Sequence, residues 1–359
     1  MPNQVKLNDT NSTRVPAADL QRQLSAIFQK VGTPKDHAEI AARVLVSASV
    51  RGVDTHGVAN VIGYSRAIEN GVYTIPQQMD IISESETTAL MSGGNGIGLV
   101  SAHRGMEIAI EKARKYGLGM VSIRDGHHVG MVAYYAMMAL EHDMIGMSMT
   151  TAAPAVRPAF GAKSMLGTNP IGFAAPAGEE RDFVLDMATS TVASGKVALA
   201  RRLGVPIPAG WAITTEGGEI TTPPDGESPD WTLNPLGGTR EQGSHKGYGF
   251  AMMAEILATL LSGALPSMME GGVRGKHYFA AYNVAAFTDV DAFKDNMDRM
   301  LQTLKNTPPA PGHERVLYPG LPEHEEMQKR LAEGIPYHRE VIDWFQSISA
   351  ELDLGLELP

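Results

Sequence analysis

The stretch RDGHHVGMVAYYAMMAL (residues 124–140) places two histidines between two glycines, where a short apolar run gives way to a long one. The run before it, LGMVSI, predicts a strand, and residues 129–142 predict a helix. His127 and His128 therefore stand at a predicted strand-to-helix junction, where a ligand can reach them. The flanking glycines leave room beside the rings.

Imidazole suits proton donation and uptake near neutral pH, because its ordinary pKa is about 6.5. A purely structural histidine at the helix start is an equally good interpretation of these residues alone. Adjacent side chains on an extended chain point to opposite sides, which is poor geometry for holding one metal ion. We therefore predict no metal site.

Outward from this junction, helices alternate with short β-rich runs from about residue 81 onward. On the N-terminal side, residues 1–15 predict a loose polar arm and residues 17–49 predict two helices. Residues 204–245 are rich in Pro and Gly and predict irregular loops. Further strands are predicted at 144–150, 169–177, 182–188 and 277–287, and further helices at 101–117, 192–204, 246–266, 289–306, 322–333 and 337–352.

The ends of two predicted helices carry recognisable signals. Gly117 suits a helix C-terminus and Asp289 a helix N-cap. The alternation of elements favours an α/β or α+β fold with a substantial central sheet. It leaves strand order and direction open.

The composition excludes several classes of function. The net charge is −10 over 359 residues and the basic residues are scattered, so nucleic acid is not an expected partner. The chain has no cysteine, which removes disulfides, thiolate metal sites and cysteine nucleophiles and fits a reducing compartment. We find no signal-peptide core and no long apolar span, so we expect a cytoplasmic protein without a membrane segment.

Common cofactor and catalytic motifs are missing. The glycines of SGGNGIGLVSAHRG (residues 92–105) lack the G-x-G-x-x-G spacing, and the chain has no P-loop, H-E-x-x-H or G-x-S-x-G sequence. A Rossmann-type dinucleotide site is therefore not expected at residues 92–105, which favour a turn and a helix start.

Other polar turns stand out in the sequence. VDTHGV sets Thr55 and His56 in a glycine-flanked turn, and in LGTNPIGFAAPA the residue before Pro170, Asn169, could bond either a ligand or its own turn. LDMATS (residues 185–190) puts an acidic residue at a strand end. HKGYG (residues 245–249) puts Lys246 at a helix start, where it could meet an anion.

Taken in order, these pieces resemble the type-2 malate/L-lactate dehydrogenases, a family that includes ureidoglycolate and sulfolactate dehydrogenases, diketogulonate reductase and piperideine-2-carboxylate reductase. The likeness covers about residues 15–350. The motifs that carry it are RGVDTHGV, GHHVGMVAYYA, LGTNPIGFAAPA, LDMATS, GKV, HKGYG and YPG.

The resemblance implies a fold and an assembly. The cofactor domain, expected at residues 81–309, would be a non-Rossmann domain with a largely antiparallel central sheet wrapped by helices. Residues 1–80 and 310–359 would form a helical domain for substrate and dimer contacts. Relatives imply a homodimer or a dimer of dimers, with the active site near the subunit boundary.

The resemblance also implies the reaction, an NAD- or NADP-dependent hydride transfer to or from the α-carbon of a small 2-oxo or 2-hydroxy acid. The family pattern H-x-G-x-x-x-Y-Y gives the catalytic role to His128, with Thr55 and His56 as the substrate-side pair. The expected substrate side also includes Tyr64. The expected cofactor contacts are Ala152, Thr168, Asn169, Asp186, Met187, Ala188, Lys246 and Gly320.

One departure from the family pattern concerns the small-molecule carboxylate substrate. Relatives usually carry an arginine four residues after the turn histidine, suited to gripping a carboxylate, and this chain has Asn60 there. Arg51 or Arg157 would then hold the carboxylate, or the substrate would differ. Reduction of a C=N bond to give an amino acid, and a catalytically inactive binding protein, are the alternative interpretations.

Overall fold

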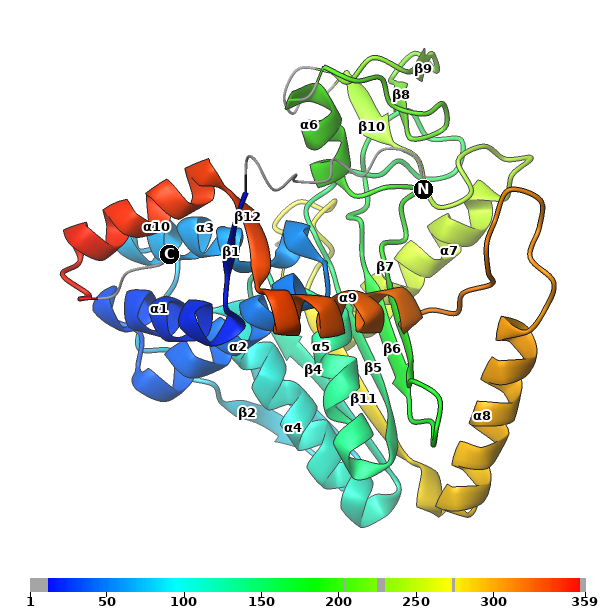
Figure 1. Cartoon of the computed structure of the whole chain (residues 1–359), viewed down its shortest axis with the longest axis horizontal. Helices are drawn as coiled ribbons and strands as arrows, with labels where there is room; N and C mark the ends of the chain where they lie inside the picture. The colour runs from blue at the N-terminus through cyan, green and yellow to red at the C-terminus, as the bar shows by residue number, and fades with distance from the viewer. Residues whose placement is uncertain (1–11, 203, 225–229, 273–274, 356–359) are drawn as a thin grey trace.

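The computed structural model describes residues 12–202, 204–224, 230–272 and 275–355. At the centre of this described part is one sheet of seven strands (Figure 1). In spatial order the strands are β2 (Ile81–Glu84), β3 (Thr88–Ser92), β4 (Leu118–Arg124), β11 (His277–Asn283), β5 (Met144–Thr150), β6 (Ile171–Ala175) and β7 (Phe183–Met187). All neighbours are antiparallel except β3 and β4. The predicted largely antiparallel sheet is confirmed.

Helices cover both faces of this sheet. On one face lie α4 (Gly98–Tyr116) and α5 (Val132–Met138); on the other lie α7 (Ser244–Ala254) and a π-helical turn, η4 (Glu255–Thr259). Alternate residues of β11 serve the two layers: Phe279 packs in the core with α4 and α5, and Tyr278 packs with the residues of α7 and η4.

Both predicted helix ends are confirmed. Gly117 has a left-handed φ of 85° and donates its backbone N–H to the Ala113 carbonyl at 2.8 Å. The Asp289 carboxylate accepts the Ala292 N–H at 2.9 Å and begins α8 (Val290–Lys305). These capping bonds satisfy backbone groups that a helix end leaves open.

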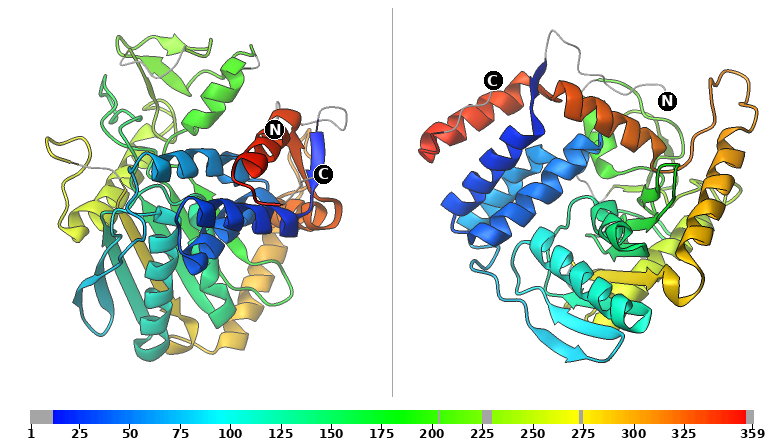
Figure 2. Two further views of the ribbon diagram at one scale, coloured as in Figure 1. Left: turned by 90° about the vertical axis from the view of Figure 1, so that its left-hand side faces the viewer. Right: turned by 60° about the horizontal axis from the view of Figure 1, so that its bottom comes forward.

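The two ends of the chain meet beside the sheet. Helices α1 (Ala17–Lys30), α2 (Lys35–Val50) and α3 (Val61–Glu69) pack there with α9 (Leu321–Glu333) and α10 (Arg339–Glu351) (Figure 2). Strand β1 (Ser12–Val15) pairs with β12 (Ile335–His338). The prediction of a loose arm is therefore wrong for residues 12–15, because each strand is stabilised by a partner distant in the sequence. Residues 1–11 lie outside the described residues.

Residues 204–245 are less irregular than predicted. They contain a small antiparallel sheet of β8 (Ala212–Thr214), β9 (Glu219–Ile220) and β10 (Trp231–Leu233). With α6 (Ser194–Arg202) it forms a lobe at the top of Figure 1 and of the left-hand view in Figure 2. The strands are too short for a periodic signal, and their pairing supplies what the sequence pattern lacks.

Two predicted helices have different bounds in the structure. The helix after the histidines begins at Val132 rather than 129, because Gly130 adopts a left-handed φ of 67° and Met131 is extended. The helix expected over 246–266 loses α-helical hydrogen bonding at Glu255. Both deviations occur beside the predicted site.

Candidate active site

His128 lies in the loop between β4 and α5, with its ring exposed to solvent. Its Nδ1 is 2.7 Å from the hydroxyl oxygen of Tyr64, a buried residue of α3. The same hydroxyl lies 3.3 Å from the His128 carbonyl oxygen. Tyr64 is therefore the partner that holds one ring nitrogen. Nε2 has no hydrogen-bond partner among the described residues.

The Tyr64 hydroxyl has one proton and two acceptors within reach. When it donates to Nδ1, Nε2 carries the ring proton; when it donates to the carbonyl, it can accept from Nδ1–H and leave Nε2 ready to take up a proton. Both tautomers of His128 are thus compatible with this geometry. Such an exchange suits a group that must act as acid in one direction and base in the other.

The predicted Thr55–His56 pair faces His128. The imidazole rings of His56 and His128 stack with centroids 5.5 Å apart and an interplanar angle of 21°. The Thr55 hydroxyl lies 3.0 Å from Nδ1 of His56. Asn60 donates its amide to the Thr55 carbonyl at 3.0 Å, so it closes the turn that carries the pair.

A buried arginine anchors this turn. Arg330 of α9 makes two bonds to the carboxylate of Asp54, at 2.6 and 3.0 Å, and one to the Ser49 carbonyl at 2.6 Å. A two-point guanidinium–carboxylate bond fixes orientation as well as distance. Sequence analysis did not identify Arg330, because 276 residues separate it from Asp54.

His127 has surroundings different from those of His128. Its ring packs on Tyr73 with centroids 4.4 Å apart, and its Nε2 lies 2.9 Å from the Asn95 side-chain oxygen. The two adjacent histidines therefore point to different neighbours. His128 is the one that joins Tyr64 and His56 in one cluster.

The protein around His128 lowers its pKa to about 4, first through loss of hydration and then through the nearby charge of His56. Loss of hydration also lowers the pKa of His56. A low pKa favours the neutral ring of His128 at pH 7 in the free protein. A protonated His128 requires a negative charge from a bound ligand.

Four segments that contain predicted cofactor contacts meet where β5 ends, β6 begins and β7 ends. We call this part of the sheet its cofactor edge. The Ala152 N–H donates to the Asn169 side-chain oxygen at 3.1 Å. Thr189, which follows Asp186, Met187 and Ala188, donates both its N–H and its hydroxyl to the Thr168 carbonyl. Lys246 is exposed in the first turn of α7. The next residue, Gly247, packs closely against the backbone of Leu236.

Asn169 itself has no surface open to solvent. Its amide nitrogen donates to the Ala251 carbonyl and to a Glu255 carboxylate oxygen, each at 3.1 Å. The side chain therefore bonds other elements of the protein rather than its own turn. Glu255 was not identified from sequence, since a glutamate in an apolar helix gives no signal of its partner.

Asp186 connects this edge to the helix that follows His128. Its carboxylate accepts the Ala133 N–H at 3.1 Å in the first turn of α5, a favourable place for a negative charge. Loss of hydration raises its pKa to about 6, against the effects of this bond and of Arg51. The side chain is exposed, so a ligand can reach it.

Gly320 completes the edge. It has a φ of 97°, and a Cβ at this position would lie 2.8 Å from the Val184 nitrogen. The Pro319 carbonyl accepts the Val184 N–H at 3.1 Å. Only glycine allows this close approach of the turn to β7.

The two candidate carboxylate-binding arginines differ in their bonds. Arg157 donates Nε to the Asn234 side chain at 2.7 Å and Nη1 to the Gly161 carbonyl at 3.2 Å. Arg51 is buried, and its guanidinium has no hydrogen bond to any described residue. Burial lowers the pKa of Arg51, against the charges of Glu323, Asp186 and Asp182.

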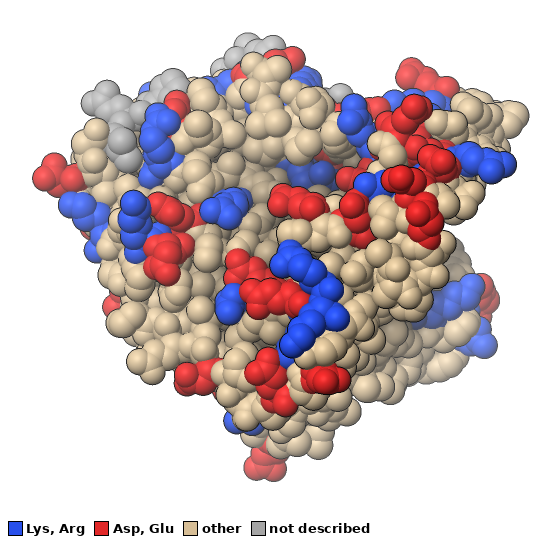
Figure 3. Space-filling view, turned by 90° about the horizontal axis from the view of Figure 1, so that it is seen from below, with Lys and Arg blue, Asp and Glu red and all other residues tan. Residues whose placement is uncertain are grey.

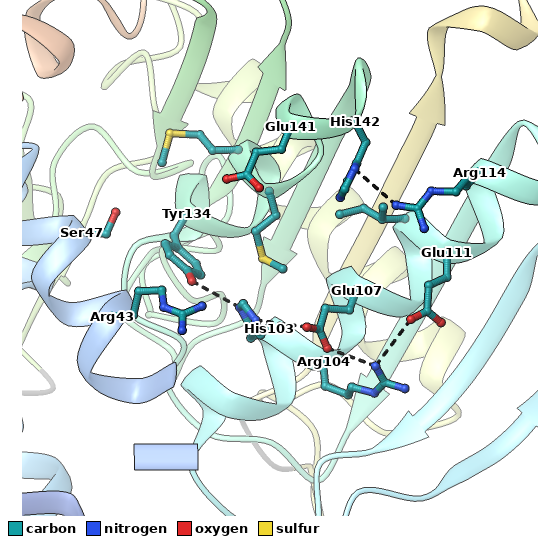
Figure 4. A pocket seen from close by; sticks show the side chains of 13 residues that line it. Arg43, Ser47, His103, Arg104, Glu107, Glu111, Arg114, Tyr134, Glu141 and His142 are labelled. Atoms are coloured by element: carbon teal, nitrogen blue, oxygen red, sulfur yellow. Dashed lines mark hydrogen bonds and ion pairs between the residues drawn. The ribbon is translucent and has the colours of Figure 1, made fainter. Parts of the chain in front are cut away.

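A separate cavity of about 550 Å³ lies on the outer side of α2, α4 and α5 (Figure 4). The Tyr134 hydroxyl lies 3.3 Å from Nδ1 of His103, whose Nε2 is 3.4 Å from Glu107. None of the predicted site residues lines it.

Tyr135, the other tyrosine of the motif, donates to the Val129 carbonyl at 2.6 Å and so fixes the residue after His128.

Other kinds of site find no support in the described residues. No group of three or more histidine, aspartate or glutamate side chains there is placed to hold a metal ion. None of the helices described is long and apolar enough to span a membrane. On the face in Figure 3, basic and acidic side chains are interspersed, without a continuous basic surface.

Comparison with known proteins identifies the family of this chain. Residues 15–346 match the family model described as malate/L-lactate dehydrogenase. The chain is 40% identical to a malate dehydrogenase of Pyrococcus abyssi, over 98% of each protein. It is 31% identical to the NAD(+) ureidoglycolate dehydrogenase of Escherichia coli K12, over 88% of each.

A solved structure gives the same result. The malate dehydrogenase of Entamoeba histolytica matches with a TM-score of 0.91 and 33% identity, covering 95% of this chain and 98% of that one. Sequence, fold and solved structure therefore agree, and this chain belongs to the malate/L-lactate dehydrogenase family of oxidoreductases.

Proposed function

We propose that this protein is an NAD(P)-dependent dehydrogenase of small 2-hydroxy and 2-oxo acids, with His128 as the proton donor and acceptor. The observation that carries the proposal is the bond of 2.7 Å between Tyr64 and Nδ1 of His128, in a ring that is exposed and has Nε2 without a protein partner. This leaves one ring nitrogen for substrate. The malate and ureidoglycolate dehydrogenases named above act on 2-hydroxy acids.

The edge that ends at Gly320 fits a dinucleotide. A Cβ would fill the space that Gly320 leaves beside β7. The other residues here lie mostly in turns, and the side chains of Asp186 and Lys246 are exposed. The residues that would hold the cofactor are Ala152, Thr168, Asp186, Met187, Ala188, Lys246 and Gly320. Bound there, the nicotinamide ring would accept hydride from a 2-hydroxy acid or donate it to a 2-oxo acid.

The chain itself moves the proton. In oxidation, neutral His128 takes the substrate hydroxyl proton on Nε2 while the Tyr64 hydroxyl holds Nδ1. In reduction, protonated His128 returns that proton to the carbonyl oxygen. The anionic substrate favours the protonated ring and so opposes the low pKa of the free protein.

Arg51 is our proposed partner for the substrate carboxylate. It keeps its guanidinium without hydrogen bonds to described residues, and it ends α2 four residues before Thr55. Arg157 has two nitrogens bonded to protein acceptors. Arg51→Gln is therefore expected to raise KM for the acid about tenfold, and Arg157→Gln to leave it nearly unchanged. The reverse result would assign the carboxylate to Arg157.

We further propose a homodimer. Large apolar side chains are exposed along α7 and the turns after it, at Phe250, Met252, Ile256, Leu260 and Leu261. Several large apolar side chains exposed along one short segment favour a protein interface there. Light scattering after gel filtration should give a dimer for the wild type and a monomer for Leu261→Glu. A wild-type monomer contradicts this part of the proposal.

The reaction is tested with purified protein and NADH or NADPH against a panel of 2-oxo acids, with and without methylamine, and cyclic imines. Loss of reduced-nicotinamide absorbance with a 2-oxo acid alone supports the proposal. Turnover that requires methylamine or an imine would assign C=N reduction instead. Lack of turnover across the panel would leave the binding-protein alternative.

A further inference from the structure

A buried glutamate lies directly beneath the proposed cofactor edge. Glu255 is 5% exposed, and both of its carboxylate oxygens are bonded. One accepts the Asn169 amide at 3.1 Å, and the other accepts the Thr259 hydroxyl at 2.9 Å. The charge of buried Lys276 also acts with this carboxylate. A buried carboxylate is costly unless it is bonded in this way, so a function is expected for it.

The first partner of Glu255 has an unusual backbone. Asn169 has a φ of 34°, a conformation that residues other than glycine rarely adopt. Its side chain joins three elements: the Ala152 N–H after β5, the Ala251 carbonyl of α7, and Glu255. The backbone of Asn169 is therefore held in a strained conformation by the hydrogen bonds of its own side chain.

The second partner reaches the same place from the other side. The Thr259 hydroxyl lies 3.2 Å from the hydroxyl of Thr151, the residue before Ala152. Glu255 thus bonds two side chains that fix Ala152 and its neighbour. Through the backbone, Thr151 bonds Lys276 and Gly275, and Gly275 accepts the Gly126 N–H in the loop of the two histidines.

The helix is distorted where it carries this carboxylate. Residues Glu255–Thr259 form a π-helical turn between α7 and a 3-10 turn. Such turns are rare and are found often at functional sites. The turn sets Glu255 and Thr259, the two ends of one hydrogen bond, against the sheet.

We propose that Glu255 is a positioning residue for cofactor binding, which acts through Asn169 and Thr259 on Ala152 and the Thr168 turn. The inference rests on the proposed function, because it takes these residues as cofactor contacts. Glu255 itself touches neither cofactor nor substrate. Its removal is expected to weaken dinucleotide binding more than it slows turnover at saturating cofactor.

The test uses the full chain with Glu255→Ala, Glu255→Gln, Asn169→Ala and the double variant. NADH and NADPH dissociation constants are measured by fluorescence, kcat and KM by absorbance, and melting temperature by circular dichroism. Glu255→Ala is expected to weaken binding about tenfold, the effect of one buried bond to a charged group. Glu255→Gln is expected to bind nearly as the wild type does, since its amide oxygen can still accept from Asn169.

The double variant tests whether the two residues act as one unit. If they do, Glu255→Ala/Asn169→Ala binds cofactor no more weakly than the worse single variant. Additive losses would overturn the proposal. Thr259→Val keeps the test valid if Glu255→Ala does not fold: about threefold weaker binding is expected, and unchanged binding overturns the proposal.

Asp298→Asn is the control for loss of a buried carboxylate. Asp298 is 8% exposed and accepts three backbone N–H groups at residues 178–180, in the turn that joins β6 to β7, at the opposite end of β6 from Asn169. It is expected to melt at a lower temperature and to bind cofactor normally. Equal weakening of cofactor binding in Asp298→Asn and Glu255→Ala would overturn the positioning role.

The wild type distinguishes failure of this proposal from failure of the proposed function. A wild type that binds neither dinucleotide overturns the proposed function as well, whereas normal binding by a folded Glu255→Ala overturns the positioning role alone.

Discussion

Two polar clusters lie at the same end of the sheet, and they differ in how completely they are bonded. Around His128, the ring is exposed and Nε2 has no partner among the described residues. Around Asn169 and Glu255, the amide and the carboxylate are buried and bonded to protein. The open cluster can exchange protons with a ligand, and the closed cluster can only hold the backbone in place.

This difference separates chemistry from positioning in terms that substitutions can test. Removing a proton carrier stops a chemical step, whereas disturbing a closed network costs stability and binding. The two clusters should therefore respond differently to changes of similar size.

The largest effect is expected from His128→Gln in the open cluster. Loss of a general acid–base group should lower kcat by at least about 10²-fold with the protein still folded. The matched control is His127→Gln, which changes the neighbouring ring that packs on Tyr73. It is expected to stay within about fivefold of the wild type in the same assay, and equal losses would remove the distinction between the two histidines.

Tyr64→Phe should have the next largest effect. The change removes the hydroxyl that holds Nδ1 of His128 and keeps the buried ring. We expect kcat to fall about tenfold, the effect of one hydrogen bond that orients the catalytic group, with a smaller change in KM. An unchanged kcat would show that the phenol is not needed to orient His128.

Gly167→Ala tests the closed cluster through stability. A Cβ at this position would lie 2.4 Å from the Asn169 side-chain oxygen and 2.6 Å from the Ala152 carbonyl. Denaturant titration should show a loss of about 1–3 kcal/mol in the free energy of unfolding, since the network has no space for a methyl group. Gly249→Ala is the control, because its Cβ would meet nothing within 4 Å. Equal stability in both variants would contradict the tight packing inferred here.

Asn60→Ala should have the smallest effect. The Asn60 amide donates to the Thr55 carbonyl in a partly exposed turn that Arg330 also anchors. KM for the acid is therefore expected to rise about twofold, with kcat unchanged, because an exposed hydrogen bond contributes little. A loss of 10²-fold in steady-state kinetics would place Asn60 in the chemistry.

The sequence predicts local features of this molecule better than distant contacts. Strand β4, the caps at Gly117 and Asp289, and the antiparallel sheet expected from the family resemblance are all confirmed. The pairing of β1 with β12 was not predicted, because neither segment has a strand pattern of its own. Its stability comes from a partner about 320 residues away.

The same limit applies to the site. The position of His128 follows from one motif, but its bond to Tyr64 links residues 64 positions apart. Glu255 lies in an apolar helix pattern that predicts regular structure, whereas the buried bonds to Asn169 and Thr259 accompany a π-helical turn. A charged residue within an apolar helix pattern is the sequence signal that indicates such a buried network.

The most direct test of His128 as the proton carrier is the pH dependence of kcat/KM for oxidation of a 2-hydroxy acid, with circular dichroism confirming the fold at each pH. The base form of His128 is required in this direction, and the surrounding protein and His56 lower its pKa to about 4. We expect kcat/KM to stay constant from pH 8 to about pH 5 and to halve near pH 4. The same break in the residual activity of His128→Gln would assign the titration to another group and contradict this assignment.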